Sequence, residues 1–153
     1  MKAAFPFIFS MLRGVILLLL GGSLMIPAPR PAHAADGDFV WATGFGQTAD
    51  DEGYDIFVDT AGNVYTTGYF RGTVDFDPGP GTLALTSAAN SRDIFISKLD
   101  SGGNLVWAKS IGGVSNDMGW GIIADSAGNV YTTGDFVGTV DFDPGAGTAP
   151  LTS

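Results

Sequence analysis

The chain has 153 residues, 45% of them hydrophobic, with no cysteine, one histidine and a formal net charge of −9. Without cysteine it has no disulfides, and His33 lies in an N-terminal segment that we expect to be removed. The rest therefore has no Ser-His or Cys-His nucleophile system and no conventional zinc site. The acidity argues against nucleic acid and anionic membranes as partners, because both are bound through Lys and Arg.

The segment 1–34 predicts a secretory signal peptide. Lys2 and Arg13 precede the apolar run Val15–Leu20, and Ala32–Ala34 presents the small residues of a cleavage site. A membrane anchor is the alternative, but the run is short for a bilayer span and is followed by Gly and Pro. We expect residues 35–153 to be secreted or held at the cell surface, with no membrane span once the signal is removed.

The remaining sequence repeats itself at a fixed offset, so that 36–87 aligns with 102–153. Gly62–Gly68 recurs as Gly128–Gly134, and Gly72–Gly79 recurs as Gly138–Gly145. A repeat of fixed period is one supersecondary unit that buries its apolar face against its neighbours. The period divides the chain into a first unit of about residues 36–101 and a partial second unit, 102–153.

Short apolar runs between Gly, Asp and Asn predict β-strands, and no 3.6-residue apolar period indicates a helix. In chain order the predicted strands are 39–45, 53–58, 64–70, 93–99, 105–111, 119–124 and 130–136. The segment 39–45 repeats the fourth strand of a unit, and an excursion at 72–87 lengthens the unit. Four antiparallel strands per tandem unit are typical of a β-propeller blade. The fold class predicted is all-β, with about two such units, the second incomplete.

Three loops between strands share one composition, and we interpret them as hairpin turns. They begin at Asp59, Asp100 and Asp125, and each ends in Gly-Asn. Asp accepts hydrogen bonds from backbone N–H groups two residues on, and Gly tolerates positive φ. These three Asp residues are therefore expected to build turns and not to act as ligands or acids.

Aromatic residues recur throughout both units. A propeller blade buries both faces, so we expect these rings to pack between blades. The residues concerned are Trp41, Tyr65, Phe70, Phe76, Phe95, Trp107, Trp120, Tyr131, Phe136 and Phe142.

The repeated runs also resemble a known family. They read DTAGNVYTTGYFRGTVDFDPG, DIFISKLDSGGNLVWAKSIGG and DSAGNVYTTGDFVGTVDFDPG, and they are similar to the bacterial SBBP-type β-propeller repeats over residues 38–153. The resemblance implies a secreted or cell-surface repeat protein that is usually much longer, and it implies no catalytic residues. Only one unit is whole, so we interpret the chain as a truncated piece of a larger propeller. Assembly of several short copies into a ring is the alternative.

Two short acidic motifs are the best candidates for a metal site. Asp75 and Asp77 precede Pro-Gly in the first unit, and Asp141 and Asp143 do so in the second. Carboxylates at i and i+2 of an extended segment share one face and could begin a calcium site. The alternative is that each Asp caps a strand end where Pro-Gly reverses the chain. No other cofactor is expected, and the run Asp50–Glu52 is interpreted as a solvated loop.

The sequence favours an exported, non-catalytic module for binding or scaffolding. Its partner would be an unknown protein or glycan, and further blades would come from a longer chain or from self-association. Two alternatives stay open: an enzyme acting on glycans on the same scaffold, and a truncated fragment without independent function. No pair of carboxylates is placed by the sequence at the separation that glycoside hydrolysis requires.

Overall fold

The computed structural model describes residues 39–153, and the signal peptide predicted for residues 1–34 lies outside them. Residues 43–153 belong to one compact unit. The described residues are all-β apart from one 3₁₀ turn, Ala88–Asn90. This confirms the predicted fold class.

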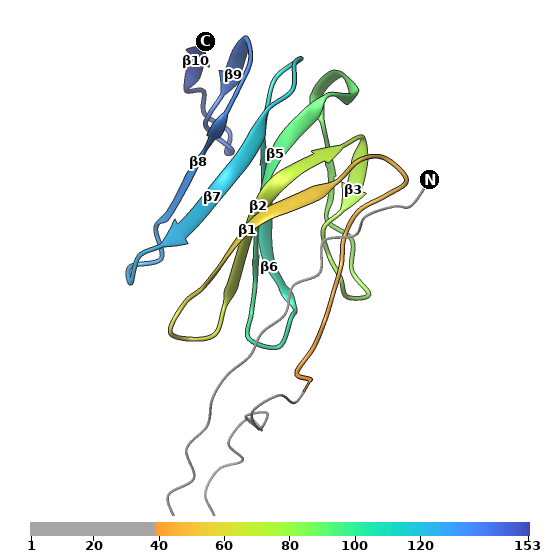
Figure 1. Ribbon diagram of the computed structural model, residues 1–153, viewed down its shortest axis with the longest axis vertical. Helices are drawn as coiled ribbons and strands as arrows, with labels where there is room; N and C mark the ends of the chain where they lie inside the picture. Colours follow the sequence, from red (N-terminus) through yellow and green to blue (C-terminus); the bar gives the residue numbers. More distant parts are fainter. Residues whose placement is uncertain (1–38) are drawn as a thin grey trace, which may run out of the picture. The chain divides into compact units, whose positions relative to one another are not determined.

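A four-stranded antiparallel sheet forms the body of the unit (Figure 1). Its strands are β1 (Glu52–Val58), β2 (Val64–Arg71), β5 (Arg92–Leu99) and β6 (Leu105–Ile111), in the order β1-β2-β5-β6. The four central predicted strands are confirmed to within one residue at each end. The alternation of apolar and polar residues and the turn residues between the strands were therefore sufficient to place them.

The second unit begins with a hairpin of β7 (Met118–Ala124) and β8 (Val130–Asp135). The excursion of each unit folds into a smaller hairpin, which the sequence did not predict. These hairpins pair β3 (Thr73–Asp75) with β4 (Ala84–Thr86), and β9 (Thr139–Asp141) with β10 (Pro150–Thr152). Two units thus begin alike, each with a long hairpin followed by a short one.

The strand predicted at residues 39–45 is wrong, because the structure has no strand there. A strand requires a neighbouring backbone to share its hydrogen bonds. The third strand of the first unit, β5, already pairs with β2 and β6. Residues 39–45 resemble the fourth strand of a unit, which would pair with a third strand. Among the described residues the second unit has no third strand, so this segment has no strand to pair with.

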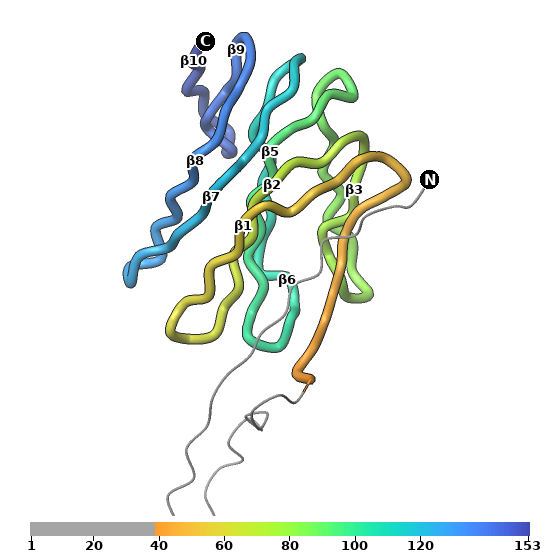
Figure 2. Tube along the Cα trace, viewed as in Figure 1, coloured from red at the N-terminus to blue at the C-terminus, as the bar shows by residue number. Residues whose placement is uncertain are grey.

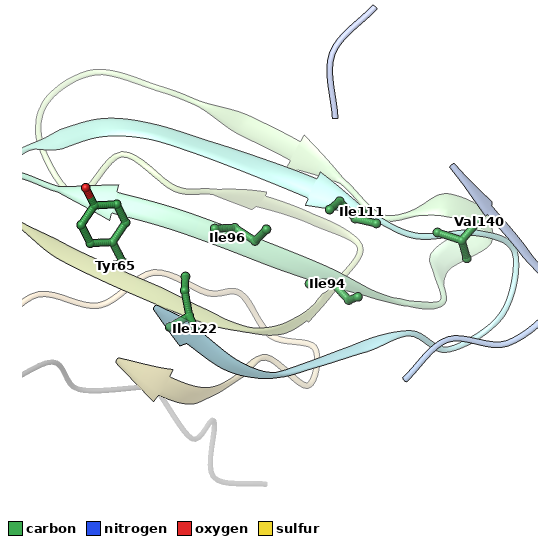
Figure 3. Close-up of a cluster of buried hydrophobic side chains, with 6 residues drawn as sticks. All are labelled: Tyr65, Ile94, Ile96, Ile111, Ile122 and Val140. Atoms are coloured by element: carbon green, nitrogen blue, oxygen red, sulfur yellow. The ribbon is translucent and has the colours of Figure 1, made fainter. Parts of the chain in front are cut away.

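β7 and β8 pack face to face on the first sheet. Figure 2 shows β7 running beside β1 and β2, and these strands are in contact. The core between them contains Ile122 of β7, Val140 of β9, and residues of β2, β5 and β6 (Figure 3), namely Tyr65, Ile94, Ile96 and Ile111. Full burial of an aliphatic side chain such as Ile122, which is 3% exposed, contributes about 1.5–3 kcal/mol.

The other side of the first sheet has an aromatic cluster. Phe76 lies with its ring centroid 4.8 Å from Phe45 and 5.3 Å from both Phe70 and Phe95. Neighbours along a strand face opposite sides, so Phe95 lies on this side while Ile94 and Ile96 lie on the other. The prediction that the aromatics pack between blades is confirmed for Tyr65, which shares a core with Ile122 of β7. Phe70, Phe76 and Phe95 are also buried, but they pack within the first unit.

A β-bulge interrupts the long hairpin of each unit at the same place. The register shifts between Gly53 and Asp55 in β1 and between Gly119 and Gly121 in β7. Opposite the first bulge, a Cβ on Gly68 would lie 1.9 Å from the carbonyl oxygen of Glu52. Only glycine fits there, which explains why the repeat has glycine again at the corresponding position, 134.

Two buried aspartates connect the loop before each long hairpin to the end of its second strand. Asp117 is 0% exposed and accepts the N–H groups of Gly113 at 2.8 Å and Val137 at 2.9 Å. Asp51 is its counterpart in the first unit and accepts the N–H groups of Gln47 and Arg71 in the same way. The interpretation of Asp50–Glu52 as a solvated loop is therefore wrong for Asp51. Backbone N–H groups without another partner draw its carboxylate inside.

Replacing Asp117 by Ala should lower the free energy of unfolding by about 2–4 kcal/mol, because two backbone N–H groups lose their acceptor in a buried place. Asp50→Ala is the matched control, since Asp50 makes one exposed ion pair with Arg92 at 3.6 Å, and such pairs contribute about 0–1 kcal/mol. Denaturant unfolding of both variants measures the difference. Equal stability of the two variants would contradict the role of Asp117.

Candidate interaction surface

The hairpin β7–β8 has one covered face and one open face. Ile122 and Ala124 pack on the first sheet, so Ile123 between them points the other way. Tyr131 pairs with Ile123 across the hairpin. These two side chains are 58% and 55% exposed. The open face therefore presents large apolar groups to its surroundings.

The equivalent face of the first unit is covered by another hairpin. Phe57 and Tyr65 occupy in that unit the positions that Ile123 and Tyr131 occupy in the second. Tyr65 is 1% exposed because β7–β8 covers it, whereas Tyr131 is 55% exposed. The second unit thus repeats a face that the first unit buries, and leaves it uncovered among the described residues.

The expectation that all the aromatics pack between blades is wrong for Tyr131 and holds only in part for Trp120, which stacks on Tyr54 of the first unit. Trp120 is 47% exposed and Tyr131 is 55% exposed. Both lie on β7–β8, and nothing in the described part of the chain packs over that hairpin as the hairpin itself packs over β1 and β2. Phe136 and Phe142, which face the first sheet, are partly buried against the core as expected.

An open hollow of about 310 Å³ adjoins the two strands. It is lined by Asp55, Gly121, Ile122, Ile123, Tyr131, Thr132 and Thr133. Asp55 is its one charged group, and both its oxygens have backbone partners. One oxygen accepts the N–H of Ile56 at 2.9 Å and the other that of Ile122 at 2.8 Å. This carboxylate joins the two units and is not free for chemistry.

An aromatic pair marks the same joint between the units. Tyr54 of β1 and Trp120 of β7 occupy corresponding positions and stack with ring centroids 4.5 Å apart. Burial and the neighbouring Glu52 carboxylate raise the pKa of Tyr54 to about 12, so its hydroxyl stays protonated at neutral pH. The Trp120 indole N–H donates to Asp135. Both rings are thus fixed in place while part of each remains exposed.

The free edge of β8 is a second open feature. Among the described strands β8 pairs with β7 alone, while its counterpart β2 is paired on both sides, with β1 and β5. Unpaired backbone groups along an edge strand can accept another strand. The second unit is therefore open at one face and at one edge.

The three predicted turn-building aspartates are confirmed. Asp59, Asp100 and Asp125 each accept backbone N–H groups two and four residues on, at 2.9 Å. Each also accepts the side-chain amide of the Asn that ends its loop. The three loops lie at the same end of the strands in Figure 1.

The predicted calcium ligands lie where the first strand of each short hairpin ends and its loop begins. Asp75 accepts the N–H groups of Asp77 and Leu83, and Asp141 accepts those of Asp143 and Ala149. Asp77 and Asp143 each accept the N–H of a glycine two residues on. Residues 39–153 contain no group of three or more His, Cys, Asp or Glu placed to hold a metal. Calcium binding by these four residues stays a prediction.

One buried carboxyl group has a raised pKa. Burial raises the pKa of Asp93 against the lowering effect of hydrogen bonds from Ala88 and Ser91, and the nearby Asp117 adds to the rise. Asp93 accepts the Ala88 N–H at 2.8 Å and the Ser91 hydroxyl at 2.9 Å. Its oxygens are engaged in holding the turn before β5, so it faces no substrate space.

The sequence analysis did not predict that Asp51, Asp55 and Asp117 accept backbone N–H groups from other segments of the fold. A signal was present for two of them, because Asp51 recurs as Asp117 at the repeat offset. Asp55 gave no such signal, since Gly121 stands in its place, and only the packing of the two units reveals its role.

Comparison with known proteins points to propeller repeats. Residues 40–69 match the model of a family described as SBBP, a β-propeller repeat. A WD repeat-containing protein of Acanthamoeba polyphaga mimivirus is 28% identical over 116 residues, which cover 67% of this chain and 8% of the relative. The chain thus spans less than a tenth of that relative's length. No solved structure matches.

These similarities agree with the geometry above. WD repeats form propeller blades of four-stranded sheets, and the first unit is such a sheet. The protein is built as a repeat scaffold. None of the described residues forms a helix long and apolar enough to cross a membrane.

The turn aspartates predict loss of stability in acid. Hydrogen bonds from Asn104 and Asn129 and from backbone N–H groups hold the pKa of Asp100 and Asp125 below the ordinary value. For Asp59, burial would raise the pKa, but hydrogen bonds from Asn63, Ala61 and Tyr65 outweigh it and lower the pKa. A carboxyl with a lowered folded-state pKa stabilises the fold above its unfolded pKa, near 3.9, and loses that effect as pH falls through the folded value.

The melting temperature should therefore fall as pH drops from about 5 to about 3. Asp93, whose pKa is raised, acts in the opposite sense, but it is one group against five, because hydrogen bonds from backbone N–H groups also lower the pKa of Asp75 and Asp141. Thermal unfolding at a series of pH values gives the measurement, and Asp100→Asn is the matched variant because it retains a turn-forming oxygen and cannot titrate. Its pH dependence should be shallower than that of the unchanged chain, and an equally steep one would refute the assignment.

Proposed function

We propose that the chain is an exported, non-catalytic repeat module that binds or scaffolds a partner protein or glycan as part of a larger β-propeller. The observation that carries this proposal is the open face of β7–β8. Tyr131 and Ile123 repeat the position of side chains that the first unit covers. A blade face of this kind is built to be packed against, as successive blades of a propeller pack.

The surroundings of the charged residues support a non-catalytic role. Asp51, Asp93 and Asp117 are buried, Asp55 is partly buried between the two units, and each accepts at least one backbone N–H group. A general acid or base needs an oxygen that can reach a substrate. Here the enclosed carboxylates serve as acceptors for turns and joints.

The loops at one end of the strands are the proposed contact surface for a partner. The β1–β2 and β5–β6 loops lie close enough that a Cβ on Gly62 would be 3.1 Å from the Cβ of Ser101. Rigid turns anchored by Asp present a fixed surface, which reduces the entropy lost on binding. The mimivirus relative, a WD repeat-containing protein, supports a role in which the repeats act as a platform.

Export is proposed from the sequence of residues 1–34, with residues 35–153 as the repeat region. Mass spectrometry of the protein from its native host should find an N-terminus at Ala35. The double change Ala32→Leu and Ala34→Leu should block cleavage, because signal peptidase requires small side chains there. Ala3→Leu is the control and should be processed normally. An N-terminus at Met1 in the unchanged chain would contradict export by cleavage.

Binding without turnover is the expected biochemical behaviour. Incubation with a panel of defined glycans, followed by mass analysis, should return every glycan at unchanged mass, including any that binds the immobilised protein. Release of shorter products would favour the glycan-cleaving alternative.

A further inference from the structure

We infer that the open face of β7–β8 is a docking site for a second copy of this chain, which would join head to tail through the outer face of β1. The inference rests on the proposed scaffold function and names its partner. The outer face of β1 and the open face of β7–β8 are the two complementary surfaces of this contact. A contact of the same kind already exists within the chain, where β7–β8 packs on the first sheet.

The internal contact serves as the template. Ile122 and Ala124 of β7 and Val130 of β8 pack on the first sheet, where Tyr65 belongs to the receiving core. We call the face of β7–β8 that packs on the first sheet the inserting face, and the face of β1–β2 that it covers the receiving face. Ile122 is 3% exposed and Tyr65 is 1% exposed, so this contact excludes water on both sides.

The inserting face recurs on β1. Ile56 and Val58 are the first-unit counterparts of Ile122 and Ala124. They face away from the side that β7 covers, because Phe57 between them packs against the core on that side. They are 43% and 41% exposed. Val64, the counterpart of Val130, is already buried, so a second copy would meet this face along β1, in a narrower contact than the internal one.

The receiving face recurs on β7–β8. Ile123 and Tyr131 occupy the positions in the second unit that Phe57 and Tyr65 occupy in the first. The Tyr131 hydroxyl donates to Asp125 at 3.2 Å, as that of Tyr65 donates to Asp59 at 3.3 Å. The uncovered ring is therefore held in the same way as the covered one. A receiving surface that is already ordered loses little entropy when a partner arrives.

Two features make the contact between copies weaker than the internal one. Asp55 accepts the Ile122 N–H across the internal joint, but Gly121 stands in its place on the open face. The copies also repel each other, since each has a formal net charge of −9. Association should therefore increase with protein concentration and with salt, which screens the repulsion.

An inserting face on one side and a different receiving face on the other make the contact heterologous. Such contacts build rings or open chains, whereas a two-fold contact stops at a dimer. The two kinds of contact can be told apart by blocking one face at a time.

Sedimentation of the 153-residue chain over a concentration series tests the inference. The average mass should rise above the monomer mass of 15.8 kDa. Ile123→Asp blocks the receiving face and Ile56→Asp blocks the inserting face, so each variant alone should remain monomeric. An equal mixture should form dimers and stop there, because each pair retains one intact contact. Tyr131→Asp serves as a second receiving-face variant, and circular dichroism checks that each variant is folded.

Val114→Asp is the matched control, because Val114 is a loop residue that is 78% exposed and lies on neither face. It should associate like the unchanged chain. A monomer at every concentration overturns the inference. Loss of association in Val114→Asp, or no dimer in the mixture, overturns it too. None of these outcomes bears on export or on glycan turnover, so the proposed function is tested separately.

Discussion

The face-to-face contact between β7–β8 and the first sheet is the constraint on which the rest of the structure depends. A hairpin alone cannot bury its apolar side chains, and an isolated two-stranded pair is marginal in water. Ile122 is buried in one cluster with Tyr65, Ile94 and Ile96, which belong to the first sheet. Each unit therefore depends on the next for stability, as in other tandem-repeat proteins.

Aspartate holds this arrangement together in two ways. In the hairpin loops Asp59, Asp100 and Asp125 accept backbone N–H groups and fix the turns. At the joints Asp51 and Asp117 reach inward to N–H groups that no strand satisfies. The acidity of the chain is thus in large part a consequence of its architecture. It need not report a cationic ligand or a catalytic site.

The same geometry links the fold to the proposed role. The face that is covered in the first unit is open in the second. Another unit of the same kind could pack on it in the same way. Such a scaffold presents its loops at one end of the strands in a regular array (Figure 1). Function then resides in what the array positions, because the enclosed carboxylates are already committed to the backbone.

The sequence by itself determined the repeat, the four long strands of the first unit and the roles of the three loop aspartates, because these depend on local patterns of apolar, turn and capping residues. It could not decide which aromatics are buried. Tyr65 and Tyr131 have identical neighbours from Gly62 to Gly68 and from Gly128 to Gly134, yet one is 1% and the other 55% exposed. Likewise Asp51 looked like part of a solvated loop, and residues 39–45 looked like a strand. Burial and strand pairing depend on which other segment lies alongside, and only the tertiary structure decided that.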